Sequence, residues 1–289
     1  MVKLENNRLI AEIAERGSEL VRIYDKTKER EMLWNGNPDI WPKHSPLLFP
    51  MVGRSYNNTY KHKGRNYEML NHGFAWTSAF SFTKKEDTFA EAVLTDSEET
   101  LKNYPFNFKL TVGHKLEDNR IVITWKVENT GKDTMYYNIG AHPAFVTQPG
   151  IKTSDMYVSF PGKNSLHYLF TNRESGCALT QTVYEMPLKD GSIRITPSFW
   201  DNDAYIFEHQ DINELGLLDE NKAPYVTVKC NGFPFCGVWT KPGAPFVCLE
   251  PWYGRCNDDR FEGELKDKFG ILSLQPGEKK DYSYTIVIE

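Results

Sequence analysis

The chain has 289 residues and a formal net charge of −5, from 34 lysines and arginines against 39 aspartates and glutamates, so it offers no broad positive surface for nucleic acid. Hydrophobic residues make up 40% and charged residues 25%, proportions typical of a globular protein and not of a disordered one. No apolar run reaches the roughly 18 residues of a membrane-spanning helix and the first residues contain no secretory signal, so we expect a cytoplasmic protein without membrane contact.

In chain order, the first predicted element is a hairpin. Residues 11–24 are rich in Glu and Arg, which suits a helix, but Gly17 interrupts them and favours two strands joined by a turn. Further segments are bounded by Gly, Pro, Asn or Asp and have the composition of short strands. These segments are 80–83, 90–95, 106–112, 225–230, 246–249 and 282–288.

The clearest alternation of apolar and polar residues lies at 121–127. Its apolar members share one face, and they are Ile121, Ile123, Trp125 and Val127. Residues 129–133 have turn chemistry, and a second apolar segment follows at 135–139. The pattern predicts a hairpin in which 121–127 and 135–139 are antiparallel neighbours.

Together these elements predict an all-β fold. Many short strands separated by turns, with no linker, repeat or break in composition, indicate one large antiparallel β-sandwich that forms a single domain over residues 1–289. In such a sandwich a site is expected on a concave sheet face, where polar residues gather near the ends of strands.

The sequence lacks the common signatures of nucleotide-binding, zinc-protease and serine-hydrolase sites. Its five cysteines are an odd number without a Cys-x-x-Cys pair, and we expect them to be reduced thiols. The last four are separated by six, twelve and eight positions, unlike the closely spaced ligands of structural zinc sites. We therefore expect no bound metal.

Four stretches combine unusual residues, at 45–54, 71–76, 138–145 and 247–254. They contain Arg54, His72, His142 and Glu250, in that order. A lone histidine is more often exposed or satisfied in a core than functional. Glu250 is harder to explain in that way, because a carboxylate directly after Phe-Val-Cys-Leu is expected to be buried or at a cleft edge and to need partners.

A structural explanation of Glu250 is also open. The carboxylate could form a buried ion pair with Arg54 or Arg255 and have no chemical role. The sequence alone does not distinguish this ion pair from a catalytic site.

In these stretches the chain resembles the aldose 1-epimerase (galactose mutarotase-like) family, in its divergent bacterial branch. The resemblance extends over nearly the whole chain and includes Leu-Phe-Pro-Met-Val-Gly-Arg at 48–54, His-Gly-Phe at 72–74, His-Pro-Ala-Phe at 142–145 and Leu-Glu-Pro-Trp at 249–252. Single motifs are weak, but the ordered set is specific. The resemblance implies a β-sandwich that binds a small-molecule sugar across a concave sheet, with no metal or organic cofactor.

The resemblance also implies an aldose 1-epimerase that interconverts the α and β anomers of an aldohexose. Glu250 matches the family's general base and His142 its general acid, while His72 and Asp203 match residues that bind sugar hydroxyls. Arg54 matches the basic position of its loop in the divergent branch and is expected to bind substrate. A carboxylate is ionised at neutral pH, and a negative neighbour could keep a histidine protonated, as these roles require.

The chain departs from the family pattern at two positions. Mainstream galactose mutarotases have an Asn-Arg pair that contacts the sugar where this chain has Asn57 and Asn58, so Arg54 could replace the missing guanidinium. Relatives that act on hexose 6-phosphates commonly have an arginine where this chain has Trp76. That difference disfavours a phosphorylated substrate.

Two other functions stay open. Lys43, Arg54 and Arg255 could bind a phosphate, which would make the protein a hexose-6-phosphate 1-epimerase. The same fold could also serve a non-catalytic carbohydrate-binding or sensing protein. The joint presence of Glu250 and His142 favours an enzyme, because binding alone does not require an acid and a base.

Overall fold

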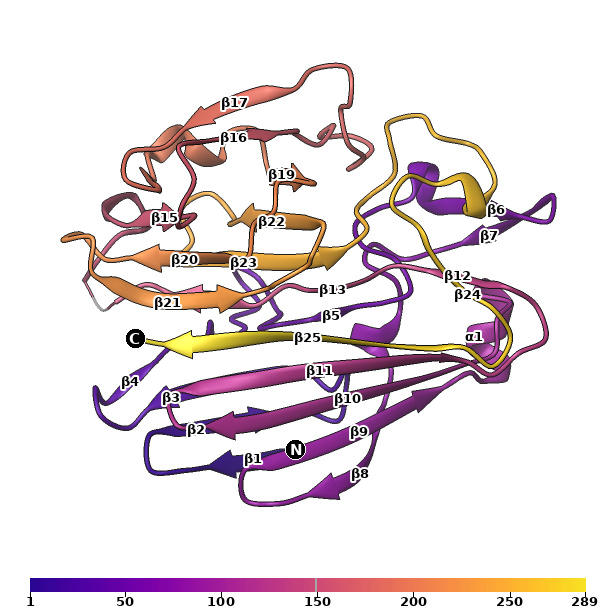
Figure 1. Ribbon diagram of the computed structural model, residues 1–289, viewed down its shortest axis with the longest axis horizontal. Coiled ribbons are helices and arrows are strands. Elements are labelled where there is room, and N and C mark those ends of the chain that lie inside the picture. The colour runs from indigo at the N-terminus through magenta and orange to yellow at the C-terminus, as the bar shows by residue number, and fades with distance from the viewer. Residues whose placement is uncertain (149) are drawn as a thin grey trace.

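The computed structural model describes residues 1–148 and 150–289, and its regular elements are mostly antiparallel strands (Figure 1). The largest sheet has nine strands, all paired antiparallel. Their order is β18 (Ser192–Arg194), β15 (Tyr157–Ser159), β20 (Glu214–Leu218), β21 (Pro224–Lys229), β25 (Lys279–Ile288), β11 (Arg120–Asn129), β10 (Phe108–Glu117), β9 (Phe89–Thr95) and β8 (Ser81–Lys85).

A second sheet of six strands runs behind the first in Figure 1. Its order is β19 (Tyr205–Glu208), β22 (Phe235–Trp239), β23 (Phe246–Tyr253), β13 (Ile139–Ala141) and β5 (Leu47–Leu48), with β14 (Ala144–Val146) also paired to β23. A third sheet has β1 (Val2–Glu5), β2 (Leu9–Ile13), β3 (Leu20–Asp25) and β4 (Arg30–Glu31) in chain order.

Short elements complete the described chain. The two-stranded sheets pair β6 (Thr59–His62) with β7 (Arg65–Glu68), β12 (Met135–Tyr137) with β24 (Leu272–Leu274), and β16 (Ser165–Tyr168) with β17 (Tyr184–Pro187). The helical turns are η1 (Tyr56–Asn58), η2 (Ala75–Thr77), α1 (Glu98–Asn103), η3 (Thr153–Asp155), η4 (Pro197–Trp200) and η5 (Leu265–Asp267). None of the described helices is long and apolar enough to cross a bilayer.

One continuous hydrophobic core joins the three large sheets. The alternating face predicted at 121–127 is buried in this core, because strand side chains point to opposite faces in turn. The all-β antiparallel sandwich predicted from the sequence is confirmed. The N-terminal hairpin is confirmed too, since β2 and β3 pair antiparallel and Gly17 has a φ of +72° in the turn between them.

The hairpin predicted between 121–127 and 135–139 is wrong. β11 pairs with β10 on one side and with β25 on the other, so neither of its edges is free for residues 135–137. Those residues form β12 and pair with β24 instead. The turn residues at 129–133 do not redirect the chain to its nearest neighbour, because β25, far along the sequence, occupies that edge.

The two faces of β23 have different surroundings. Val247 and Leu249 pack into the central core, whereas Cys248, Glu250 and Trp252 alternate with them on the opposite face. Both faces are buried, so the strand has the near-continuous apolar composition of a central strand. Glu250 is therefore the one charged side chain within a buried apolar strand.

Gly237 of β22 makes room for the Trp252 side chain on this second face. A Cβ at Gly237 would lie 2.2 Å from the Trp252 ring. Gly237 is also paired with Glu250 across the two strands, so this close approach is next to the buried carboxyl group.

We expect Gly237→Ala to destabilise the protein by about 1–3 kcal/mol, because an added methyl group overpacks a filled core. Urea denaturation would measure the change in the free energy of unfolding. Gly131→Ala is the matched control, since the nearest atom to its added Cβ is 3.3 Å away. Equal losses in the two variants would contradict the packing argument.

Candidate active site

A cavity of about 320 Å³ opens on the second face of β23. All five residues singled out in the sequence line it, and they are Arg54, His72, His142, Asp203 and Glu250. They come from different parts of the chain, and the six-stranded sheet with its loops brings them together. The volume lies at the small end of the range for ligand pockets, which suits a small molecule.

Glu250 and His142 are neighbours at the bottom of this cavity. Glu250 belongs to β23, His142 directly follows β13, and these two strands are paired. The distance between His142 Nε2 and Glu250 Oε2 is 3.3 Å, and the residues are 7% and 1% exposed. A buried acid and a buried imidazole thus share one small space, although they are far apart in the sequence.

The ion pair of Glu250 with an arginine, considered above, does not form. Arg255 is buried, but its guanidinium binds Glu208 and Asp258. Arg54 forms no ion pair with Glu250 in the described structure, where His142 is the only basic partner of this carboxyl group. Arg255, the buried arginine that could have paired with Glu250, is thus already paired with two other carboxylates.

The His142 ring is held by aromatic neighbours. It stacks on Trp41 with centroids 5.1 Å apart and planes at 30°. It meets Trp239 edge to face at 5.5 Å and His72 at 5.4 Å. Aromatic pairs with these geometries add stabilisation beyond that of the buried area. They therefore favour one orientation of the imidazole toward Glu250.

His72 lies in a turn with a φ of +66°, and its Nδ1 accepts a hydrogen bond of 3.1 Å from the backbone N–H of Gly53. Burial, with the charges of Lys43 and Arg54, lowers the pKa of His72 to about 3. A neutral imidazole that accepts at Nδ1 carries its proton at Nε2. His72 is therefore a neutral hydrogen-bond donor toward the cavity, as a sugar hydroxyl requires.

Asp203 is fixed on the other side of the cavity. Its Oδ1 accepts a hydrogen bond of 2.8 Å from Trp239 Nε1, and its Oδ2 accepts one of 2.9 Å from Thr171 Oγ1. Each carboxylate oxygen has a second lone pair, which can accept from a ligand hydroxyl. Asp203 also acts on Glu250, because its negative charge opposes ionisation of the second carboxyl group.

Burial determines the protonation of the central pair. Burial raises the pKa of Glu250 well above its usual value, and the charge of Asp203 adds to the effect. Burial also lowers the pKa of His142 well below its usual value, with contributions from His72 and Lys43. In the empty cavity both groups are favoured as neutral, whereas the sequence suggested an ionised carboxylate and a protonated imidazole.

Three buried polar atoms at this site have no hydrogen-bond partner among the described residues. They are His142 Nδ1, Glu250 Oε2 and Trp252 Nε1. Buried polar groups are nearly always paired, so such a group of unpaired atoms is typical of a place where a ligand or water binds.

Three side chains at this site carry atoms that can bind a metal ion. His142, Cys248 and Glu250 offer ligand atoms within 4.8 Å of one another. Burial, reinforced by Glu250, raises the pKa of the Cys248 thiol well above its usual value, however. A thiol must lose its proton to bind a metal, so this site disfavours one.

Sequence reasoning missed part of the cavity wall. Arg173 lines the cavity from the loop after β16, and no motif marks it in the sequence. Trp239 lines it from the end of β22, and only its contacts in the folded chain identify it as part of the cavity wall. Arg255, considered earlier as a phosphate ligand, does not line the cavity.

The departures from the family pattern have simple spatial explanations. Asn57 lines a separate cavity, so it does not take the place of a sugar contact in this one. Trp76 carries the ammonium of Lys43 over its ring, with Lys43 Nζ 3.7 Å from the ring centroid. Lys43 lines the cavity, so a cation is present near the position at which the arginine is missing.

Comparisons with known proteins identify the family of the chain. A family model described as aldose 1-epimerase matches residues 1–285. A galactose mutarotase related enzyme from Lactobacillus acidophilus is 29% identical, with a TM-score of 0.94 over 99% of this chain and 96% of that one. A galactose mutarotase-like protein from Lactobacillus casei is 26% identical, with a TM-score of 0.91 over the full length of both.

Among curated proteins, the chromosomal Protein LacX of Lactococcus lactis subsp. lactis is 27% identical over 296 residues, which cover 99% of both chains. The matches in sequence and in structure therefore extend over practically the whole chain. With its galactose mutarotase-like β-sandwich, the protein belongs to the aldose 1-epimerase family.

Proposed function

We propose that the protein is an aldose 1-epimerase, which interconverts the α and β anomers of an aldohexose. The observation that carries this proposal is the pair of Glu250 and His142, two buried groups of acid–base chemistry 3.3 Å apart in one cavity. His72 and Asp203 offer a neutral donor and a charged acceptor for sugar hydroxyls beside them.

The reaction needs one base and one acid. Transfer of the Glu250 proton to His142 first gives a carboxylate and an imidazolium. Glu250 then takes the proton from the C1 hydroxyl while His142 gives a proton to the ring oxygen, and the bond between C1 and the ring oxygen breaks. The aldehyde end rotates about the bond from C1 to C2. Closure on the opposite face returns the proton from Glu250 to the C1 oxygen and takes the ring hydroxyl proton back to His142.

The geometry suits this exchange because the two reacting oxygens are bonded to the same carbon, so the acid and the base must also be close together. The charges suit it as well. Ring opening converts a carboxylate and an imidazolium into a carboxylic acid and an imidazole, the neutral forms that burial favours. The cavity thus stabilises the pair that accompanies the open-chain sugar.

A non-catalytic carbohydrate-binding protein is less consistent with this site. Burying a carboxyl group and an imidazole with polar atoms that form no hydrogen bond costs free energy, and a binding protein gains nothing from that cost. Neutral polar groups could bind the same hydroxyls without it. The buried acid–base pair therefore favours an enzyme.

We expect Glu250→Gln and His142→Asn each to lower kcat/KM by about 10² to 10⁴, the usual contribution of one general acid or base. Polarimetry of a freshly dissolved anomer of glucose or galactose measures the rate. Glu185→Gln, an exposed carboxylate outside the cavity, is the control and should keep wild-type activity. Wild-type turnover by Glu250→Gln would reject the carboxylate as the base.

Glu250→Gln should also change how stability depends on pH. Because burial raises the pKa of Glu250, the unfolded chain loses this proton at a lower pH than the folded protein. The free energy of unfolding of the wild type therefore falls, relative to that of the variant, as the pH rises above about 4.3. The total loss is about 1.4 kcal/mol for each unit by which folding raises the pKa of Glu250.

Urea denaturation from about pH 4 to about pH 8 would measure this difference. The expected result is a growing stability advantage of Glu250→Gln toward high pH. A difference that stays constant with pH would contradict a carboxyl group that is neutral in the folded protein.

A hexose-6-phosphate 1-epimerase is the second candidate, and one observation favours it. Lys43, Arg54 and Arg173 line the cavity, and none of them forms an ion pair in the described structure. Lys43 and Arg54 lie near enough to His72 to lower its pKa, so these two cations gather on one side. Such cations, free of carboxylates, suit a phosphate group.

The double variant Arg54→Ala/Arg173→Ala distinguishes these two substrates. With glucose 6-phosphate we expect KM to rise about tenfold or more, the effect of losing a charge-assisted contact of about 1.5–3 kcal/mol, while KM for glucose stays nearly constant. Arg120→Ala, exposed on the nine-stranded sheet, is the control. Equal effects on both sugars, or no turnover of the phosphate by wild type, would reject the second candidate.

A further inference from the structure

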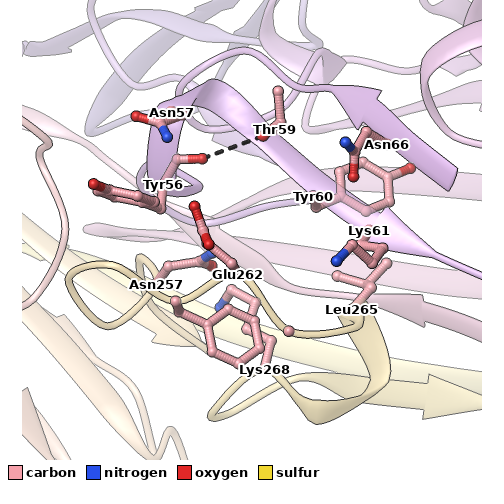
Figure 2. Close-up of a pocket in the computed structure, with 12 residues that line it drawn as sticks. Tyr56, Asn57, Thr59, Tyr60, Lys61, Asn66, Asn257, Glu262, Leu265 and Lys268 are labelled. Carbon is pink, nitrogen blue, oxygen red and sulfur yellow. Dashed lines mark hydrogen bonds between the residues drawn. The ribbon is translucent and has the colours of Figure 1, made fainter. Parts of the chain in front are cut away.

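A second cavity, of about 200 Å³, lies next to the active site. One wall is formed by η1 and the hairpin of β6 and β7, and the other by residues 257–268 of the loop between β23 and β24. Figure 2 shows the two walls facing each other, with Tyr56, Tyr60 and Lys61 on one side and Asn257 and Glu262 on the other. The proposed reaction uses none of these residues.

The lining combines flat aromatic rings with polar side chains. The aromatic members are Tyr56, Tyr60 and Phe261. Amide groups come from Asn57, Asn66 and Asn257. Amides both donate and accept hydrogen bonds, as sugar hydroxyls do, and aromatic rings cover the apolar C–H faces of a pyranose.

Asn257 gives direct evidence for a missing partner. The residue is only 3% exposed, and its Oδ1 is buried without a hydrogen-bond partner among the described residues. A buried acceptor without a partner costs about 1–3 kcal/mol, so a ligand group or a water that donates to Asn257 Oδ1 is favoured beside this cavity.

The walls of the cavity are held in place. Tyr60 donates its hydroxyl hydrogen to the carbonyl of Asn103 at 2.7 Å and stacks on Tyr67 with centroids 5.4 Å apart. On the other side, the Phe261 ring folds over Gly263, where a Cβ would lie 2.7 Å from the ring. The backbone N–H of Gly64 also donates to Glu264 at 2.9 Å and ties the hairpin to the loop.

The charges in the cavity cancel, which favours a neutral ligand. Lys61 and Glu262 carry opposite charges. Burial lowers the pKa of Lys268 to about 7, so its amino group is partly relieved of charge near neutral pH, and it donates to Asn138 Oδ1 at 2.8 Å and to the carbonyl of Arg255. Unlike the active site with its three free cations, this cavity has no surplus of positive charge for an anion.

A thin partition separates the two cavities. The backbone N–H of Asn257 donates to the carbonyl of Arg54 at 2.9 Å. Arg54 and Cys256 line the active site, whereas Tyr56 and Asn257, on the same two segments, line the second cavity. A ligand in the second cavity is therefore next to a sugar in the active site.

We propose that the second cavity is a saccharide-binding site that takes a neutral pyranose unit. Asn257 and Asn66 bind its hydroxyls, and Phe261 covers one of its faces. The unit is a free monosaccharide, because the partition of residues 54–56 and 256–257 separates it from a sugar in the active site.

Chemical-shift mapping on the ¹⁵N-labelled protein tests this proposal, with glucose, maltose and lactose as probes up to their solubility limits. The side-chain amide of Asn66 and the backbone amide of Gly263 report on the second cavity, and the indole N–H of Trp239 reports on the active site. Saturable shifts at Asn66 and Gly263 are expected. Shifts with glucose would show that the cavity takes a single pyranose, and shifts with a disaccharide but not with glucose would contradict this.

Phe261→Ala and Glu262→Ala should each raise the Kd obtained from these shifts about tenfold. Phe269→Ala is the matched control, because Phe269 is an exposed ring in the same loop that does not line the cavity. Trp239 should respond in all variants. Absence of shifts at Asn66 and Gly263 with every probe, or shifts that Phe261→Ala and Glu262→Ala leave unchanged, would overturn the proposal. Either result leaves the polarimetric test of Glu250 unaffected.

Discussion

The burial of Glu250 beside His142 is the constraint on which the active site depends. A carboxyl group in apolar surroundings is favoured as the neutral acid, and an imidazole there is favoured as the neutral base. The protein tolerates this cost because β23 places Glu250 on the face opposite the core, where a cavity rather than a hydrophobic neighbour covers it. In the proposed reaction, this local loss of stability provides a pair of groups that can exchange a proton with a substrate.

The sheet architecture makes that arrangement rigid. β13 and β14 lie on either side of His142 and both pair with β23, so His142 and Glu250 are positioned by paired strands. Trp41 and Trp239 then restrict the imidazole from two sides. The proposed substrate contacts come instead from turns, where His72 and Asp203 have positive φ values and line the cavity. Chemistry is supported by strands, and the groups expected to choose the sugar lie on loops.

Much of the fold was predictable, because alternation of apolar residues identifies strands such as β11 without knowledge of their partners. The partners were not, and the hairpin after residue 127 failed because a distant strand competed for the same edge. The five site residues were found through their motifs. Arg173 and Asn257 were missed for a physical reason: each stands in an irregular loop, and only its place beside a cavity distinguishes it from an ordinary polar residue.

The position of β25 has a consequence for how the molecule is made. This strand lies in the middle of the nine-stranded sheet, between β21 and β11, although it is the last element in the chain (Figure 1). Before β25 has been synthesised, the strands on its two sides form two separate groups. Each group has an open edge that could pair with other nascent chains. The two halves of the sheet can be joined only after residues 279–288 have emerged, and shortening this strand would leave the halves unpaired.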